Sequence, residues 1–114
     1  MATIYHNPRC SKSRQTLEIL RAQGIEPNVA LYLEDRLDKE QLLDLLRMLG
    51  LSAGQLIRRS EQAFKDNHLN ASDTTDEQLI EAMLKYPKLI ERPIVVVGDK
   101  AVLGRPPENV MELL

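Results

Sequence analysis

The fold is decided near the N-terminus, where residues 2–33 read ATIYHNPRCSKSRQTLEILRAQGIEPNVALYL. Residues 2–6 alternate apolar and polar side chains and stop at Asn7-Pro8, which is typical of a short strand that ends in a turn. The apolar spacing of residues 11–23 predicts a helix, and residues 28–33 form a second apolar run. The first third of the chain therefore predicts a strand, a helix and a second strand.

The ends of this first helix have recognisable signals. Ser11 is a plausible N-terminal cap, and Gly24 is expected to end the helix. Between them, Leu17 and Leu20 have the spacing of residues that face a protein core.

The middle of the chain contains three helix-start patterns. Asp38 caps a predicted leucine-rich helix that ends at Gly50. Ser52 with Gln55 begins a short helix that reaches Arg58 or Arg59. Thr75 with Gln78 begins a further helix, which Pro87 ends near Tyr86. We interpret this region, at about residues 36–86, as a helical insertion.

The C-terminal third predicts a hairpin and a last helix. Ile94–Val97 is a continuous apolar run, as expected for a strand buried on both faces, and a Gly98-Asp99-Lys100 turn leads into Ala101–Leu103. Pro106 and Pro107 are expected to open a helix whose inward residues are Val110, Leu113 and Leu114. The whole order predicts an α/β fold of thioredoxin type, a four-stranded mixed sheet in one domain spanning residues 1–114.

Composition excludes several classes of protein. With 114 residues and 43% hydrophobic content, the chain is long enough for one core, and its single cysteine excludes an internal disulfide. A net charge of −2 argues against a general nucleic-acid binder, and no apolar run approaches the ~18 residues of a membrane span. Neither zinc-ligand spacing nor a signal peptide is present, so we expect no metal and a reducing, cytoplasmic setting.

The single cysteine, Cys10, lies at the expected strand-to-helix turn. The helix N-terminus favours an anion there, either a thiolate or a bound oxyanion, and Arg9, Lys12 and Arg14 add positive charge. This setting is typical of a reactive thiol of low pKa. The hydroxyl of Ser13 could donate to such a thiolate while also capping the helix.

Two histidines have different expected roles. His6, at the end of the first strand, could act as a general base, but we favour a role in supporting the turn or tuning the thiol by a hydrogen bond. His68 lies in a polar loop and is expected to be solvated.

Arginines stand at the ends of several predicted elements. Arg92 precedes Pro93 and the buried strand, and Arg105 precedes Pro106. In a thioredoxin-type sheet the turn before the third strand lies beside the first helix, so Arg92 should approach Cys10, and the bond before Pro93 is a candidate for the cis form. The guanidinium group recognises tetrahedral oxyanions through two hydrogen bonds. Of the adjacent Arg58 and Arg59, only one can point inward, and spacing does not choose between them.

These motifs together resemble the glutaredoxin-coupled arsenate reductase family. The matching segments run in order through nearly the whole chain: His6-Asn7-Pro8-x-Cys10-x-x-Ser13-Arg14, Tyr32-Leu33, Leu56-Ile57-Arg58-Arg59, Arg92-Pro93-Ile94-Val95-Val96 and Gly104-Arg105-Pro106. The resemblance implies a thioredoxin-like fold with a helical insertion and a cis bond before Pro93. It also implies Cys10 as the nucleophile, and Arg58 rather than Arg59 as an oxyanion ligand together with Arg92 and Arg105.

The same resemblance implies an activity and its partners. The reaction is the conversion of arsenate to arsenite through a cysteine–arsenic adduct, a step of arsenic detoxification, with electrons from glutathione and glutaredoxin and no bound cofactor. His6, Ser13 and Arg14 would modulate the thiol.

Other functions remain open at this point. An Spx-like regulator that binds RNA polymerase shares this fold, although the missing second cysteine and the complete arginine set argue against it. A related thiol oxidoreductase with a different substrate is a further alternative. A small phosphatase would need arginine where Thr16 stands.

Overall fold

The computed structural model describes residues 1–114, which form two compact units. The first unit comprises Met1–Asp35 and Arg92–Leu114, and the second comprises Arg36–Glu91. The second unit contains the segment that we interpret from the sequence as an insertion. The interpretation of the chain as one domain with an insertion at about residues 36–86 stays a prediction.

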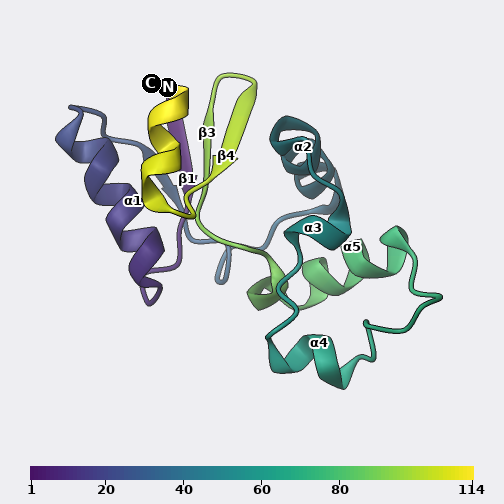
Figure 1. Cartoon of the computed structure of the whole chain (residues 1–114). Helices are drawn as coiled ribbons and strands as arrows, with labels where there is room; N and C mark the ends of the chain where they lie inside the picture. Colours follow the sequence, from purple (N-terminus) through teal and green to yellow (C-terminus); the bar gives the residue numbers. More distant parts are fainter. The chain divides into compact units, whose positions relative to one another are not determined.

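The first unit is built on a mixed sheet, drawn in purple and yellow-green in Figure 1. Its strands lie in the order β2-β1-β3-β4, with β1 parallel to β2 and the other neighbours antiparallel. This confirms the predicted four-stranded thioredoxin-like sheet. In chain order the elements are β1 (Ala2–Tyr5), α1 (Ser11–Ala22), β2 (Asn28–Ala30), β3 (Ile94–Val97), β4 (Lys100–Leu103) and the 3-10 helix η2 (Pro107–Leu113).

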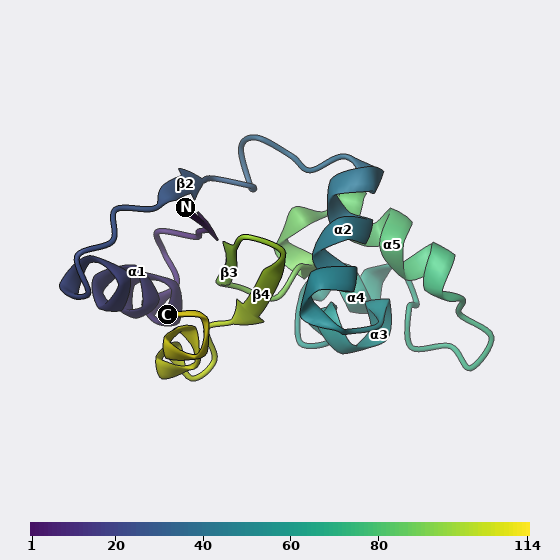
Figure 2. The same ribbon diagram turned by 90° about the horizontal axis from the view of Figure 1, so that it is seen from above.

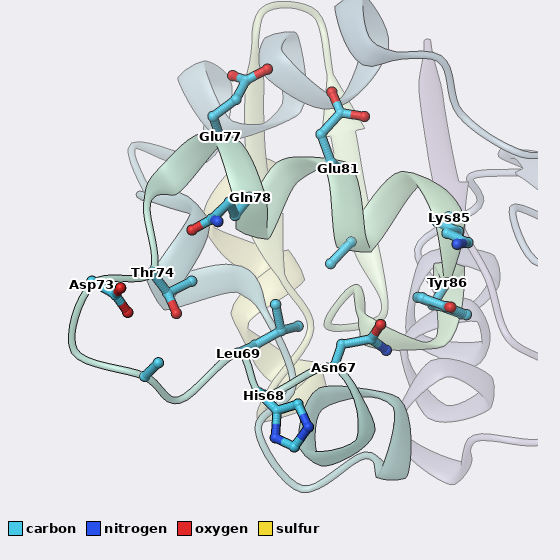
Figure 3. A pocket seen from close by; sticks show the side chains of 12 residues that line it. Asn67, His68, Leu69, Asp73, Thr74, Glu77, Gln78, Glu81, Lys85 and Tyr86 are labelled. Atoms are coloured by element: carbon cyan, nitrogen blue, oxygen red, sulfur yellow. The ribbon is translucent and has the colours of Figure 1, made fainter.

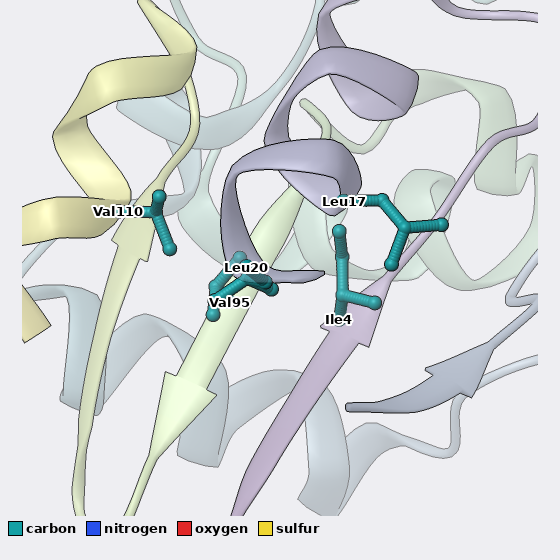
Figure 4. Packing of buried hydrophobic residues seen from close by; sticks show 5 residues of the cluster. All are labelled: Ile4, Leu17, Leu20, Val95 and Val110. Carbon is teal, nitrogen blue, oxygen red and sulfur yellow. The ribbon is translucent and has the colours of Figure 1, made fainter. Parts of the chain in front are cut away.

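One face of this sheet carries the core of the first unit. Ile4 of β1 is paired with Val95 of β3, so both side chains point to the same face. Leu17 and Leu20 of α1 and Val110 of η2 pack against them, as Figure 4 shows. Both helices therefore cover the same face of the sheet, where they lie side by side (Figures 1 and 2). The predicted inward positions of Leu17, Leu20 and Val110 are confirmed.

The ends of α1 explain how the chain enters and leaves this helix. The N-terminal cap is Cys10, whose side chain makes no capping hydrogen bond, and Ser11 is the first helical residue, so the prediction for Ser11 is wrong. At the other end Gly24 has a φ of 79°, and the N–H of Ile25 donates to the carbonyl of Leu20. This left-handed glycine closure is the predicted end of the helix.

Three further details of the first unit differ from the sequence predictions. The strand expected over residues 28–33 ends at Ala30, because the N–H groups of Glu34 and Asp35 both turn back to the carbonyl of Leu31. Within β3 the first two residues are buried and the last two only partly so. The terminal helix has 3-10 geometry, and Leu114, which follows it, is exposed rather than inward.

The second unit is helical and contains the predicted capping patterns. Asp38 and Thr75 each accept a hydrogen bond from the backbone N–H three residues later, and the glutamine at that position bonds back. Its elements are α2 (Lys39–Leu49), α3 (Ala53–Leu56), α4 (Gln62–Asp66), α5 (Asp76–Lys85) and the 3-10 helix η1 (Pro87–Leu89). The helix α4 was not predicted. No helix of the chain has the length and apolar character needed to cross a membrane.

The short helix α3 ends earlier than the sequence suggests. Ile57 forms an isolated antiparallel bridge with Ile90, and the N–H of Arg58 donates to the carbonyl of Leu89 at 2.7 Å. The backbone therefore becomes extended after Leu56. Arg58 and Arg59 are not on a helix, so the prediction that the short helix reaches them is wrong.

Candidate active site

The turn between β1 and α1 is held by Asn7. The N–H of Cys10 donates to the carbonyl of Asn7 at 3.0 Å, and the N–H of Arg9 donates to its side-chain oxygen at 3.0 Å. Asn7 is buried although it is polar. These bonds fix Cys10 at the N-terminal cap of α1 in an extended conformation, with its sulfur at the positive end of the helix.

Two arginines of the first unit lie at the Cys10 sulfur. Nη1 of Arg105 is 3.9 Å from Sγ, and Arg92 also hydrogen-bonds to the thiol through its side chain. Partial burial raises the pKa of Cys10, but the backbone N–H of Ser13, the Arg92 side chain and the backbone N–H of Lys12 together outweigh it. The pKa of this thiol is therefore lower than usual, and its thiolate form is favoured.

The loop before η2 brings Arg105 to this position. The N–H of Gly104 donates to the carbonyl of Pro93 at 2.9 Å, and Nη1 of Arg105 donates to the carbonyl of Arg92 at 3.1 Å. The peptide bond between Arg92 and Pro93 is cis, as predicted. The bond between Arg105 and Pro106 is also cis, which the sequence analysis did not predict.

Gly104 is required at this point by a close approach to α1. A Cβ atom there would lie 2.4 Å from Oγ1 of Thr16 and 2.7 Å from Cγ of Pro93. Thr16 is fully buried, and its hydroxyl donates to the carbonyl of Lys12 at 2.8 Å. Only glycine lets the loop pass this close to α1, so Gly104 positions the arginine that follows it.

His6 and Ser13 form a buried pair beneath the turn. Nδ1 of His6 and Oγ of Ser13 share a hydrogen bond of 2.5 Å, and the N–H of Asn7 donates to the same Oγ at 3.1 Å. The hydroxyl of Ser13 thus supports the turn, whereas the backbone N–H of Ser13 makes the hydrogen bond to Cys10. Burial, with the charges of Arg21 and Arg14, lowers the pKa of His6, so the neutral imidazole is favoured.

Two other cations near Cys10, Arg9 and Arg14, face solvent. Arg14 is exposed and donates from Nη1 to the carbonyl of Pro8 at 2.9 Å, which places it on the outside of the turn. Arg9 is exposed as well. Together with His6 and Ser11, Arg14 also lines a surface hollow of about 500 Å³ along α1.

Arg58 belongs to the second unit, where it is held by two carboxylates. Its Nη1 lies 2.5 Å from Oε1 of Glu91, and its Nε lies 3.4 Å from Oε2 of Glu61. Arg59 is exposed, donates to the carbonyl of Gly54 at 3.2 Å and lies over the ring of Phe64. The two adjacent arginines thus have different surroundings, and Arg58 is the more buried.

The second unit also contains an open pocket of about 500 Å³ (Figure 3). Glu77 and Glu81 of α5 belong to its lining on one side, and the loop carrying His68 and Asp73 forms its other side. None of the site residues predicted from the sequence lines this pocket. His68 itself is exposed, as expected.

Three residues of the site were not singled out from the sequence. They are Asn7, Thr16 and Gly104. The signal for Gly104 was its place directly before Arg105-Pro106, because a glycine beside a functional residue can mark a close approach of the backbone. Thr16 and Gly104 are 88 residues apart in the chain, so no local pattern identifies the contact between them.

Comparison with known proteins relates the whole chain to one family. The family model described as the ArsC family matches residues 5–113. An arsenate reductase of Escherichia coli is 46% identical over 112 residues, which cover 98% of this chain and 79% of that protein. "Uncharacterized protein YfgD" of Escherichia coli (strain K12) is 54% identical over 112 residues, covering 97% of this chain and 94% of that protein.

A solved structure agrees with this relation. The arsenate reductase from Vibrio cholerae is 48% identical and superposes with a TM-score of 0.96, covering 99% of this chain and 97% of that one.

Proposed function

The chain belongs to the ArsC family, and on that basis we propose that it is an arsenate reductase with the Cys10 thiolate as its nucleophile. The observation that carries this proposal is the position of Cys10 Sγ, at the N-terminus of α1 and 3.9 Å from the guanidinium of Arg105. A thiolate of lowered pKa beside cations can attack the central atom of a bound tetrahedral oxyanion.

The arginines supply the binding of the oxyanion. Arg92 and Arg105 lie at the Cys10 sulfur, and Arg58 is the third ligand that the family resemblance implies. Arsenate is close to a dianion at neutral pH, and attack by sulfur redistributes its charge over the oxygens. Cations that are already in place should therefore lower the barrier to attack. His6 and Ser13 act by holding the turn and the backbone N–H that faces the thiolate.

The reaction needs electrons from outside the chain. The Cys10 sulfur forms a bond to arsenic and one oxygen leaves as water. Reducing As(V) to As(III) takes two electrons, and a chain with one cysteine cannot supply them through an internal disulfide. Glutathione is the proposed co-substrate, and glutaredoxin is the proposed partner that completes the reduction. In sum, arsenate and two glutathione thiols give arsenite, one glutathione disulfide and water, with no metal or bound organic cofactor.

The test is an assay of NADPH oxidation through glutathione reductase, glutathione and glutaredoxin, with and without arsenate. We expect arsenate-dependent oxidation by the parent protein and none by Cys10→Ser. A parent protein that leaves arsenate unreduced with both partners present would refute the proposal. If that inactive protein also retained RNA polymerase in a pull-down, the regulatory alternative would replace it.

We also propose that the protein works in the cytoplasm. A catalytic cysteine must return to the thiol after each turnover, and reducing compartments keep free thiols in that state. Fractionation of cells that express the protein would test this location.

A further inference from the structure

We infer that Glu91 sets the oxyanion affinity of Arg58, because its carboxylate occupies the guanidinium in the free protein and competes with the substrate for it. The inference rests on the proposed function, in which Arg58 is an oxyanion ligand. It concerns a residue that has no direct role in the chemistry of Cys10.

The contact between Arg58 and Glu91 is short and sheltered. Nη1 of Arg58 is 2.5 Å from Oε1 of Glu91, and the two side chains are 16% and 24% exposed. By contrast, the surface pair of Arg21 and Glu26 has side chains that are 52% and 69% exposed. Water and salt screen a sheltered pair less, so the attraction between Arg58 and Glu91 should be the stronger.

The backbone keeps the two side chains opposite one another. The N–H of Arg58 donates to the carbonyl of Leu89, and the N–H of Glu91 donates to the carbonyl of Leu56 at 3.1 Å. The bridge between Ile57 and Ile90 lies between these two bonds. Arg58 and Glu91 are 33 residues apart in the chain, and the backbone pairing of their two segments places them opposite one another. Their contact is therefore not a chance meeting of two flexible side chains.

A second carboxylate also contacts Arg58. Oε2 of Glu61 is 3.4 Å from Nε of Arg58, with a side chain 27% exposed. Both contacts engage the Arg58 guanidinium, so an incoming anion has to displace a carboxylate before it can take a pair of hydrogen bonds from Arg58.

This arrangement favours one class of ligand. A carboxylate offers arginine the same pair of oxygen acceptors as a tetrahedral oxyanion does. A monoanion brings no more charge than Glu91 already supplies, whereas a dianion brings more and can displace it. Displacing Glu91 costs the same free energy whichever anion enters, so Glu91 should weaken the binding of all anions to Arg58, and only those with a strong attraction of their own, such as dianionic tetrahedral oxyanions, should bind well.

The test measures sulfate and acetate binding by calorimetry in the full chain carrying Cys10→Ser, which removes the reaction. Sulfate stays a dianion over the working pH range and acetate is a monoanion. Glu91→Gln keeps a side-chain oxygen that can accept from Arg58 but removes the charge. We expect it to bind sulfate about tenfold more tightly, and to gain a similar factor for acetate. Glu91→Asp, which keeps the charge, should show no such gain.

Glu61→Gln is the matched control, because it removes the same charge from the longer contact with the same arginine. A gain as large as that of Glu91→Gln would assign the effect to net charge and overturn the inference. Unchanged or weaker sulfate binding by a folded Glu91→Gln variant would overturn it too. If Arg58→Ala binds sulfate as the parent does, Arg58 is not a ligand and the proposed site itself is wrong. If Arg58→Ala weakens binding while Glu91→Gln does not tighten it, only the inference about Glu91 fails.

Discussion

Replacing Gly104 with alanine should impair the enzyme without altering any group that binds substrate. The added Cβ would lie 2.4 Å from Oγ1 and 3.1 Å from Cγ2 of Thr16, and 2.7 Å from Cγ of Pro93. Both neighbours are buried, so neither can swing into solvent. The loop that carries Gly104 must therefore move away from α1.

The size of the effect follows from these distances. Carbon atoms pack at about 3.5–4.0 Å, so the contact with Pro93 alone requires a shift of roughly 0.8 Å. Overpacking of this kind costs about 1–3 kcal/mol of stability. Arg105 directly follows Gly104 and would move with it, and a misplacement of about 1 Å in an active site can cost about 10²-fold in rate. We expect kcat/KM to fall by one to two orders of magnitude.

Urea unfolding and the arsenate-dependent NADPH assay measure the two consequences. Adding Thr16→Ala to Gly104→Ala removes both contacts with Thr16 and should restore part of the lost stability, which a double-mutant cycle quantifies. Gly54→Ala is the control, since its Cβ would meet Nη2 of Arg59 at 3.5 Å, Cδ1 of Leu79 at 3.9 Å and Oγ of Ser52 at 4.0 Å, which are all ordinary contact distances. A Gly104→Ala protein as stable and as active as the parent would show that the reasoning about this close approach is wrong.

Other substitutions test the remaining parts of the site. Alkylation of Cys10 by iodoacetamide should reach half its maximal rate below the ~8.5 of a free cysteine, because its pKa is lowered; a midpoint at or above that pH would contradict the assignment. Ser13→Ala should weaken turnover, whereas Cys10→Ser should abolish it, and equal complete losses would argue against these separate roles. Arg59→Ala should be near neutral in kcat/KM, and a severe loss there would show that the wrong arginine of the pair was chosen. Alanine at each proposed oxyanion ligand should lower kcat/KM by about one to two decades, because it removes one charge-assisted partner. These ligands are Arg58, Arg92 and Arg105. Because folding lowers the pKa of His6, the unfolded state binds the proton more readily, and the free energy of unfolding should fall as pH drops below about 6.5. In urea titrations, His6→Asn should reduce this dependence of the unfolding free energy on pH. An unchanged dependence would mean that another group causes it.

Local interactions explain why much of the second unit could be predicted from the sequence. The capping boxes at Asp38 and Thr75 join residues only three apart, so the residue types alone specify where α2 and α5 begin. In the same way, Gly24 marks the end of α1 because a left-handed residue is needed there. The prediction failed at α3, where the bridge from Ile57 to Ile90 draws the chain into an extended form. That pairing overrides the local helical signal.

The sequence by itself determined that one thiol stands at the start of a helix, because the strand, turn and helix patterns around Cys10 are all local. Only the tertiary structure decided what surrounds that thiol. Arg105 is 95 residues from Cys10 in the chain, and its guanidinium reaches the sulfur because Gly104 lets the last loop pass close to α1. The hydroxyl of Ser13 bonds to His6 rather than to the thiol, and Arg58 is paired with Glu91. Each of these contacts depends on backbone segments that meet only after folding, and a linear pattern of residue types carries no distance between them.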